Sequence, residues 1–203
     1  MFETIKSGGI LMIPIILCAV VALFIIIERI HYYVTLKNRD RKMMETVVDC
    51  LEKMDYSTAE ADCIRADTPC SQVIRTAIKY RRLDEANLKE VVQTKMDSVV
   101  QQFEHLLSAL GTIANISTLL GLLGTVTGNI AAFNVLGNGG SMGDPSALAS
   151  GIAQALVTTV AGLVVAIPSI IFNSYFNNRV NHLIRDMEAD VTQVMFRILG
   201  KEV

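Results

Sequence analysis

The sequence has few of the features that are typical of soluble enzymes and nucleic-acid-binding proteins. It has no tryptophan, and only 19% of its residues are charged, against about 25% in soluble domains. No basic block or basic–aromatic pattern indicates nucleic acid. The three histidines are scattered and the four cysteines show no CxxC spacing, so we expect no metal site. Nothing resembles a nucleophile–base pair, a phosphate loop or a redox centre, so we expect neither an enzyme nor a cofactor.

Three long runs without charge take the place of these features. They cover residues 10–27, 111–136 and 147–172. At about 1.5 Å per residue, each run is long enough to cross a bilayer as a helix. A cleaved signal peptide is the competing interpretation of the first run. The length of that run, and the absence of a basic N-terminal region and an A-x-A-like site, weaken it. We therefore expect an all-α polytopic membrane protein with three transmembrane helices.

Charge placement predicts which side of the membrane each segment occupies. Residues 29–105 hold 13 of the 18 Lys and Arg residues, so the positive-inside rule places them in the cytoplasm. The turn-rich loop 137–143 has no basic residue and is expected outside. The expected organisation is an outer N-terminus (1–9), a first transmembrane helix (8–28), a cytoplasmic helical region (29–105), a second transmembrane helix (106–136), an outer loop (137–146), a third transmembrane helix (147–172) and a cytoplasmic amphipathic C-terminal helix (173–203).

Capping signals divide the polar region into helices. We expect helices at about 36–54 and 57–66, and a third that begins with Thr68 as N-cap and Pro69 at the first helical position. Asp84 can cap the next helix, whose apolar pattern continues to the second transmembrane run without a breaker. A single helix of about 50 residues is therefore expected to join cytoplasm and membrane. Helices two and three would both extend into a cytoplasmic helical bundle.

The second and third transmembrane runs are unusually rich in glycine and threonine. Steps of three or four residues give each helix one face of small and polar residues. Two interpretations stay open for these faces: close packing of neighbouring helices, or a polar lining that holds water. Neither run contains Asp, Glu, His or Lys, so any carboxylate that carries a proton must come from another chain. The candidate packing residues are Gly121, Gly124, Gly128, Gly151, Gly162 and Pro168, and the candidate lining residues are Asn115, Thr118, Thr125, Gln154, Thr158 and Thr159.

Two ordered motifs carry a resemblance to a known family. The first is GLLGTVTG at 121–128, and the second is GIAQALVTT at 151–159 followed by AIP at 166–168, with Asp144-Pro145 between them. Together they resemble the signature of the MotA/TolQ/ExbB proton channel family. The three crossings are those of the ExbB/TolQ branch, whereas MotA has four.

The resemblance implies a bacterial inner-membrane homopentamer whose second and third helices line a central pore. It implies an ExbD- or TolR-like single-span partner inside that pore, whose membrane aspartate carries the proton, and a TonB- or TolA-like protein that passes the work to the outer membrane. Thr125 matches the family's pore threonine on helix two, and Thr159 matches its counterpart on helix three.

One position departs from the family pattern, and two other functions stay open. Gln154 stands where the ExbB/TolQ pattern has glutamate, and glutamine cannot titrate. The glutamate is therefore either dispensable to conduction or replaced here by a hydrogen-bonding role, and an ion other than H⁺ is a further open alternative. Glu28, beside Arg29 at the end of helix one, is expected to be an interfacial charge paired with its neighbour. The alternatives to an ion-driven motor are a non-conducting membrane scaffold and a stator subunit of the flagellar type.

Overall fold

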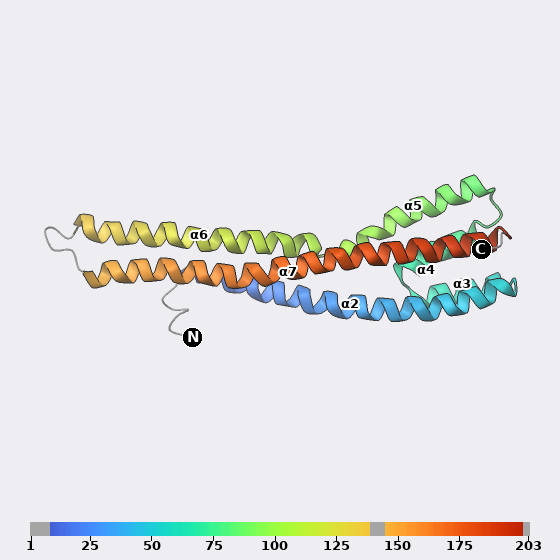
Figure 1. The fold of residues 1–203 in the computed structure, drawn as a ribbon, viewed down its shortest axis with the longest axis horizontal. Helices are drawn as coiled ribbons and strands as arrows, with labels where there is room; N and C mark the ends of the chain where they lie inside the picture. Colours follow the sequence, from blue (N-terminus) through green and yellow to red (C-terminus); the bar gives the residue numbers. More distant parts are fainter. Residues whose placement is uncertain (1–8, 139–144, 201–203) are drawn as a thin grey trace. The chain divides into compact units, whose positions relative to one another are not determined.

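The computed structural model describes residues 9–138 and 145–200, and all secondary structure within these ranges is helical. The helices are α2 (Met12–Glu52), α3 (Tyr56–Ala66), α4 (Pro69–Lys79), α5 (Glu85–Glu104), α6 (Leu107–Asn138) and α7 (Pro145–Ile198) (Figure 1). The chain divides into two parts. The apolar part comprises the described residues of 1–27 and 106–175, and the polar part comprises those of 28–105 and 176–203.

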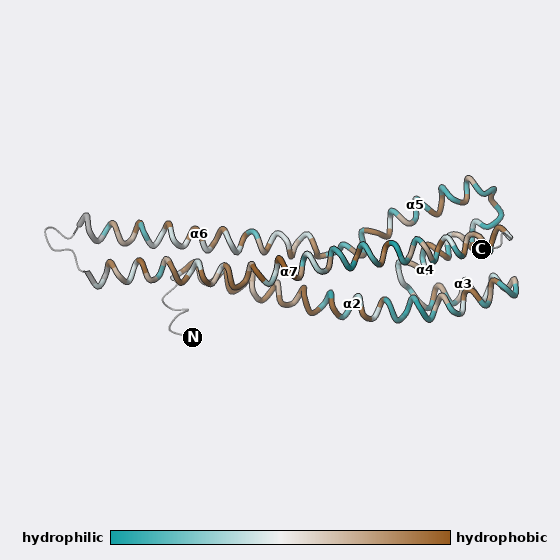
Figure 2. The backbone as a smooth tube through the Cα atoms, viewed as in Figure 1, coloured by the Kyte–Doolittle hydropathy of each residue, from teal (hydrophilic) through white to brown (hydrophobic). Residues whose placement is uncertain are grey.

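The apolar part contains the segments that were expected to cross a membrane. Three helical stretches are long and apolar enough to do so: Met12–Glu52, Glu85–Asn134 and Leu148–Ile198. Figure 2 shows hydrophilic residues gathered along the polar part and few of them along α6 and the first half of α7. Large apolar side chains such as Phe24, Phe133 and Val164 stay 65–69% exposed in the single chain. Exposed apolar surface on this scale is characteristic of chains that meet lipid or other helices.

The polar part is built from helices whose starts follow the capping signals. The Asp55, Thr68 and Asp84 side chains accept backbone N–H bonds at the starts of α3, α4 and α5. Thr68 also forms a reciprocal capping box with Ser71, directly before Pro69. These caps satisfy N–H groups that have no partner inside the helix. Within this part α4 packs against both α3 and α5, and fully buried side chains such as Ile74, Leu88 and Phe103 form its core.

Two helix boundaries differ from those expected. The helices expected at 8–28 and 36–54 are one continuous helix, α2, since no Gly or Pro lies between them. Conversely, the helix expected to run unbroken from Asp84 into the membrane is interrupted at His105 and Leu106. Leu106 has a φ of 66°, a left-handed conformation that costs a non-glycine residue about 1–2 kcal/mol. The expected cap at Asp144 lies outside the described residues.

Candidate pore-lining helix pair

Close backbone contact defines the seam between α6 and α7 in the apolar part. A Cβ atom added to Gly124 would lie 2.0 Å from the Thr158 hydroxyl, and one added to Gly128 would lie 2.7 Å from the Ala155 Cβ. At Gly162 an added Cβ would meet the carbonyl oxygen of Ser117 at 2.5 Å. None of these separations is compatible with a side chain, so the two helices approach as closely as they do because these positions are glycine. Gly121 and Gly151 lie in the same seam, with added-Cβ distances of 3.2 Å to the nearest atoms of α7 and α6 respectively.

The threonines of α7 use their hydroxyls in this seam. Thr158 is buried, and its hydroxyl donates to the carbonyl of Ala155 at 2.9 Å within its own helix. Thr159 donates across the seam to the carbonyl of Gly121 at 3.0 Å. It lies partly exposed at the edge of the seam. The Thr158 hydroxyl is therefore buried between the two helices and bonded within α7. Thr159 forms a hydrogen bond between the helices and is also partly exposed at the surface of the pair.

The polar residues of α6 form a strip beside the seam. Asn115 and Thr118 are exposed and Thr125 is partly exposed. The positions 115, 118 and 125 share one helical face. The Thr118 and Thr125 hydroxyls donate to the carbonyls of Ala114 and Leu122, at 3.1 and 2.6 Å. A hydroxyl that donates to its own helix keeps its lone pairs free to accept from water or another group, so this strip can hold a polar guest.

The buried face of α6 differs in part from the face expected from sequence. The face drawn through Asn115 and Thr118 is exposed over that half of the helix. The buried positions are instead Leu107, Leu110, Ala114, Ser117, Gly121, Gly124, Gly128 and Ala132. The expected face comprised residues 111, 115, 118, 121, 125, 128 and 132. The two faces therefore share Gly121, Gly128 and Ala132 and diverge toward the start of α6. The small-residue spacing of Ser117 and Gly121, four apart, was the signal for the correct face.

Two polar side chains in this part were not singled out from sequence. The Ser117 hydroxyl is fully buried and has no hydrogen-bond partner among the described residues. The Asn173 amide lies against Gly111, where an added Cβ would be 3.3 Å from its nitrogen. Both mark points where polar groups are enclosed between α6 and α7.

Gln154 and Pro168 occupy different surroundings from the threonines. The Gln154 amide lies over Gly9, whose added Cβ would be 2.1 Å from its nitrogen, and Gly9 has a φ of 68°. Pro168 lies inside α7 and removes the N–H that would bond the Val164 carbonyl. The nearby Ser169 hydroxyl donates to the carbonyl of Val165 at 2.7 Å.

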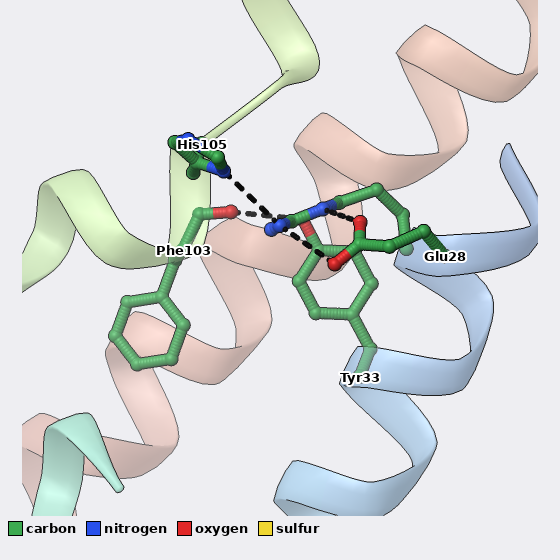
Figure 3. Close-up of polar contacts among 5 residues, drawn as sticks. Glu28, Tyr33, Phe103 and His105 are labelled. Atoms are coloured by element: carbon green, nitrogen blue, oxygen red, sulfur yellow. Dashed lines mark hydrogen bonds and ion pairs between the residues drawn. The ribbon is translucent and has the colours of Figure 1, made fainter. Parts of the chain in front are cut away.

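Glu28 and Arg29 belong to a polar cluster in the polar part, in which Arg29 is buried and Glu28 is partly exposed. Arg29 is only 3% exposed. Its Nε donates to Glu28 at 2.6 Å and its Nη2 lies 3.4 Å from the His105 Nδ1 (Figure 3). The Tyr33 hydroxyl donates to the carbonyl of Phe103 at 2.9 Å, and the Arg29 guanidinium lies 4.7 Å from the centre of the Tyr32 ring. The pair expected from sequence therefore lies within a larger network that supports the end of α5.

The fold and the seam together define the class of protein. It is a polytopic helical membrane protein with a closely packed, uncharged helix pair that has a polar strip beside its seam. The model of the MotA/TolQ/ExbB proton channel family matches residues 65–189. The chain belongs to this family.

Several curated proteins are similar to the chain. An ExbB-like biopolymer transport protein from Synechocystis is 30% identical over 169 residues, which are 82% of this chain and 66% of that protein. The biopolymer transport protein ExbB of Neisseria gonorrhoeae is 29% identical over 67% of this chain and 68% of its own length. The Tol-Pal system protein TolQ of Haemophilus influenzae is 35% identical over 45% of this chain and 40% of its own length. The chain thus spans just under two thirds of the Synechocystis protein.

Proposed function

We propose that the chain is the pore-forming subunit of a proton-driven motor in a bacterial inner membrane. In this proposal five copies surround a channel lined by α6 and α7, with the N-terminus outside and the C-terminus in the cytoplasm. The observation that carries the proposal is the uncharged polar strip beside the seam, which comprises Asn115, Thr118 and Thr125 with Thr159 at its edge. The family match supports the same role.

The polar strip can form hydrogen bonds to a charged side chain that a partner protein supplies. Threonine hydroxyls donate and accept hydrogen bonds without the desolvation cost of a fixed charge. They can therefore hydrate a carboxylate in either protonation state. We propose an ExbD- or TolR-like single-span protein as the source of an aspartate, and a TonB- or TolA-like protein as the element that receives the motion. The resulting work is energised transport or envelope maintenance at the outer membrane.

The experiment is proton flux into liposomes that contain the chain and its single-span partner. Thr125→Val with Thr159→Val keeps side-chain volume and removes both hydroxyls, so we expect flux to fall by at least about tenfold, the effect of about 1.4 kcal/mol on the barrier. Thr125→Ser with Thr159→Ser keeps the hydroxyls and should retain most of the flux. Thr127→Val is the matched control, because Thr127 is exposed on another face of α6 and donates to Leu123 and Gly124.

The outcome also separates the two other functions. Unchanged flux in the double valine variant refutes the pore assignment. If no partner with a membrane aspartate copurifies and valine is tolerated throughout, the chain is a structural scaffold, for which the glycine seam alone suffices. A flagellar-type stator would instead require association with a rotor. Replacing the external proton gradient by a sodium gradient tests the other ion that Gln154 leaves open.

A further inference from the structure

Three aspartates from two helices of the polar part border one cavity. Asp40 comes from α2, and Asp186 and Asp190 come from α7. The cavity has a volume of about 380 Å³, and α4 contributes Cys70 to its wall. The remaining lining is mostly apolar, with Met44, Leu183 and Met187. Charged carboxylates at such a site give up part of their hydration.

A hydrogen bond ties Asp40 to the start of α4. The Thr68 hydroxyl donates to the Asp40 carboxylate, and the same hydroxyl accepts the Ser71 N–H at 3.1 Å as the N-cap of α4. Thr68 is only 1% exposed, so this contact is shielded from water. The side chain of Asp40 therefore connects the cavity directly to the first turn of α4.

The three aspartates have no basic partner within 4.0 Å among the described residues. Lys37 and Arg41 line the same cavity at greater distance, and the exposed Glu45 adds a negative charge. Like charges that share a poorly hydrated site resist simultaneous ionisation.

We propose that Asp40, Asp186 and Asp190 form an acidic clamp between α2, α4 and α7 that tightens when it binds a proton and loosens when it ionises. A proton on Asp40 removes its repulsion with Asp190 while an oxygen still accepts the Thr68 bond. Ionisation restores the repulsion between α2 and α7 across the cavity. The Thr68 hydrogen bond favours the ionised form of Asp40, but it does not outweigh the effect of burial. The clamp lies within the polar part, so the inference stands independently of proton conduction.

The raised pKa values of these carboxylates determine how stability changes with pH and over which pH interval. Burial raises the pKa of Asp40 from 3.8 to about 6; the Thr68 hydrogen bond opposes this shift, and the charge of Asp190 adds to it. Burial and the neighbouring Asp186 likewise raise the pKa of Asp190. The folded state thus holds more protons than the unfolded state, and stability rises as pH falls through about 6 toward 3.8. Burial holds the pKa of the Cys70 thiol well above this interval.

Hydrogen exchange of the full chain in lipid nanodiscs tests the clamp. Rates are corrected for the intrinsic pH dependence of amide exchange and compared between about pH 8 and about pH 5, across the interval in which Asp40 titrates. We expect protection of residues 69–79 to rise by about tenfold as pH falls, the equivalent of about one pKa unit. Asp40→Asn keeps an acceptor for Thr68 and removes the charge, so protection of residues 69–79 should already be high at about pH 8 and should lose the transition near pH 6, leaving only the contribution of Asp190.

Two further variants make the test decisive. Asp190→Asn should move the transition to lower pH, because Asp40 loses the negative charge of Asp190 that raises its pKa. Asp49→Asn is the matched control, an exposed carboxylate of α2 paired with Lys53, and should keep the wild-type transition. Protection that does not change with pH in the wild type, or a wild-type transition in Asp40→Asn, overturns the proposal. Should Asp40→Asn not fold, an unmoved transition in Asp190→Asn overturns it equally.

Discussion

Thr159 donates a hydrogen bond across the seam to the main-chain carbonyl of Gly121, at 3.0 Å. The contact needs two residue types at once. The hydroxyl reaches the backbone of α6 only because position 121 has no side chain, and an added Cβ there would lie 3.2 Å from the Thr159 backbone. Gly121 and Thr159 therefore act together: the glycine allows α7 to approach α6 closely, and the threonine forms a hydrogen bond between the two helices.

Filling the seam should separate the helices. At Gly162 an alanine methyl would meet the Ser117 carbonyl at 2.5 Å and the Gly121 Cα at 3.0 Å, and neither backbone atom can move by itself. We expect Gly162→Ala to destabilise the protein by about 1–3 kcal/mol, measured by thermal unfolding in detergent. Gly111→Ala is the control, since its nearest neighbour is the flexible Asn173 amide at 3.3 Å. Equal unfolding temperatures for the two variants would contradict this account of the seam.

Removing the Tyr33 hydroxyl should loosen the end of α5. Tyr33→Phe leaves the Phe103 carbonyl without its donor in a buried site, which costs about 1–3 kcal/mol. We expect faster hydrogen exchange in residues 99–105. Tyr32→Phe serves as the comparison, because it keeps the ring that stacks on Arg29 and should leave exchange there unchanged. An unaffected Tyr33→Phe would show that the break at His105 does not depend on this bond.

Glu28 and Arg29 should be energetically coupled. Arg29 is almost fully buried and its Nη1 already lacks a partner among the described residues, so deleting Glu28 leaves the guanidinium with less compensation. We expect a coupling of about 1 kcal/mol between Glu28→Ala and Arg29→Met in a double-mutant cycle of unfolding free energies, reduced because Glu28 is 35% exposed. Additive effects would mean that the ion pair contributes nothing.

The N-cap of α3 should fail in acid. Hydrogen bonds from Thr58 and Ser57 lower the pKa of Asp55 from 3.8 to about 2. Its stabilisation is therefore complete above pH 3.8 and is lost as pH falls through about 2. We expect hydrogen exchange of residues 56–66 to accelerate over this interval. Asp55→Asn still caps the helix but should show no acceleration that depends on the carboxylate; a matching acid response would assign the effect to another group.

The sequence predicts those features that depend on neighbouring residues. The starts of α4 and α5 follow from Thr68 with Pro69 and from Asp84, and the structure confirms all three roles. The break at His105 was not predictable, because neither glycine nor proline marks it. Its supports, Tyr33 and Arg29, lie about 70 residues away in the chain. The contact between Asp40 and Thr68 spans 28 residues and carries no motif.

The candidate site shows the same division. The glycines at 121, 124 and 128 specify a close helix partner by spacing alone. Spacing alone could not decide whether Asn115 and Thr118 face α7 or lie exposed, because a shift of one residue in the pattern selects a neighbouring face of the helix. Which threonines bond across the seam depends on the register between α6 and α7, and that register is set by tertiary packing.

The closed seam has a consequence for the cell. The glycines bring α6 and α7 into backbone contact, and the Thr158 and Thr159 hydroxyls are already bonded to carbonyls. The polar surface that water can reach therefore lies on the outside of the helix pair, where Thr125 lies. Under the proposed function, a passage for ions forms only when several copies of the chain enclose that surface. A newly inserted subunit would then leave the membrane electrically tight. The cell could accumulate such subunits before assembly without discharging the gradient that the finished machine consumes.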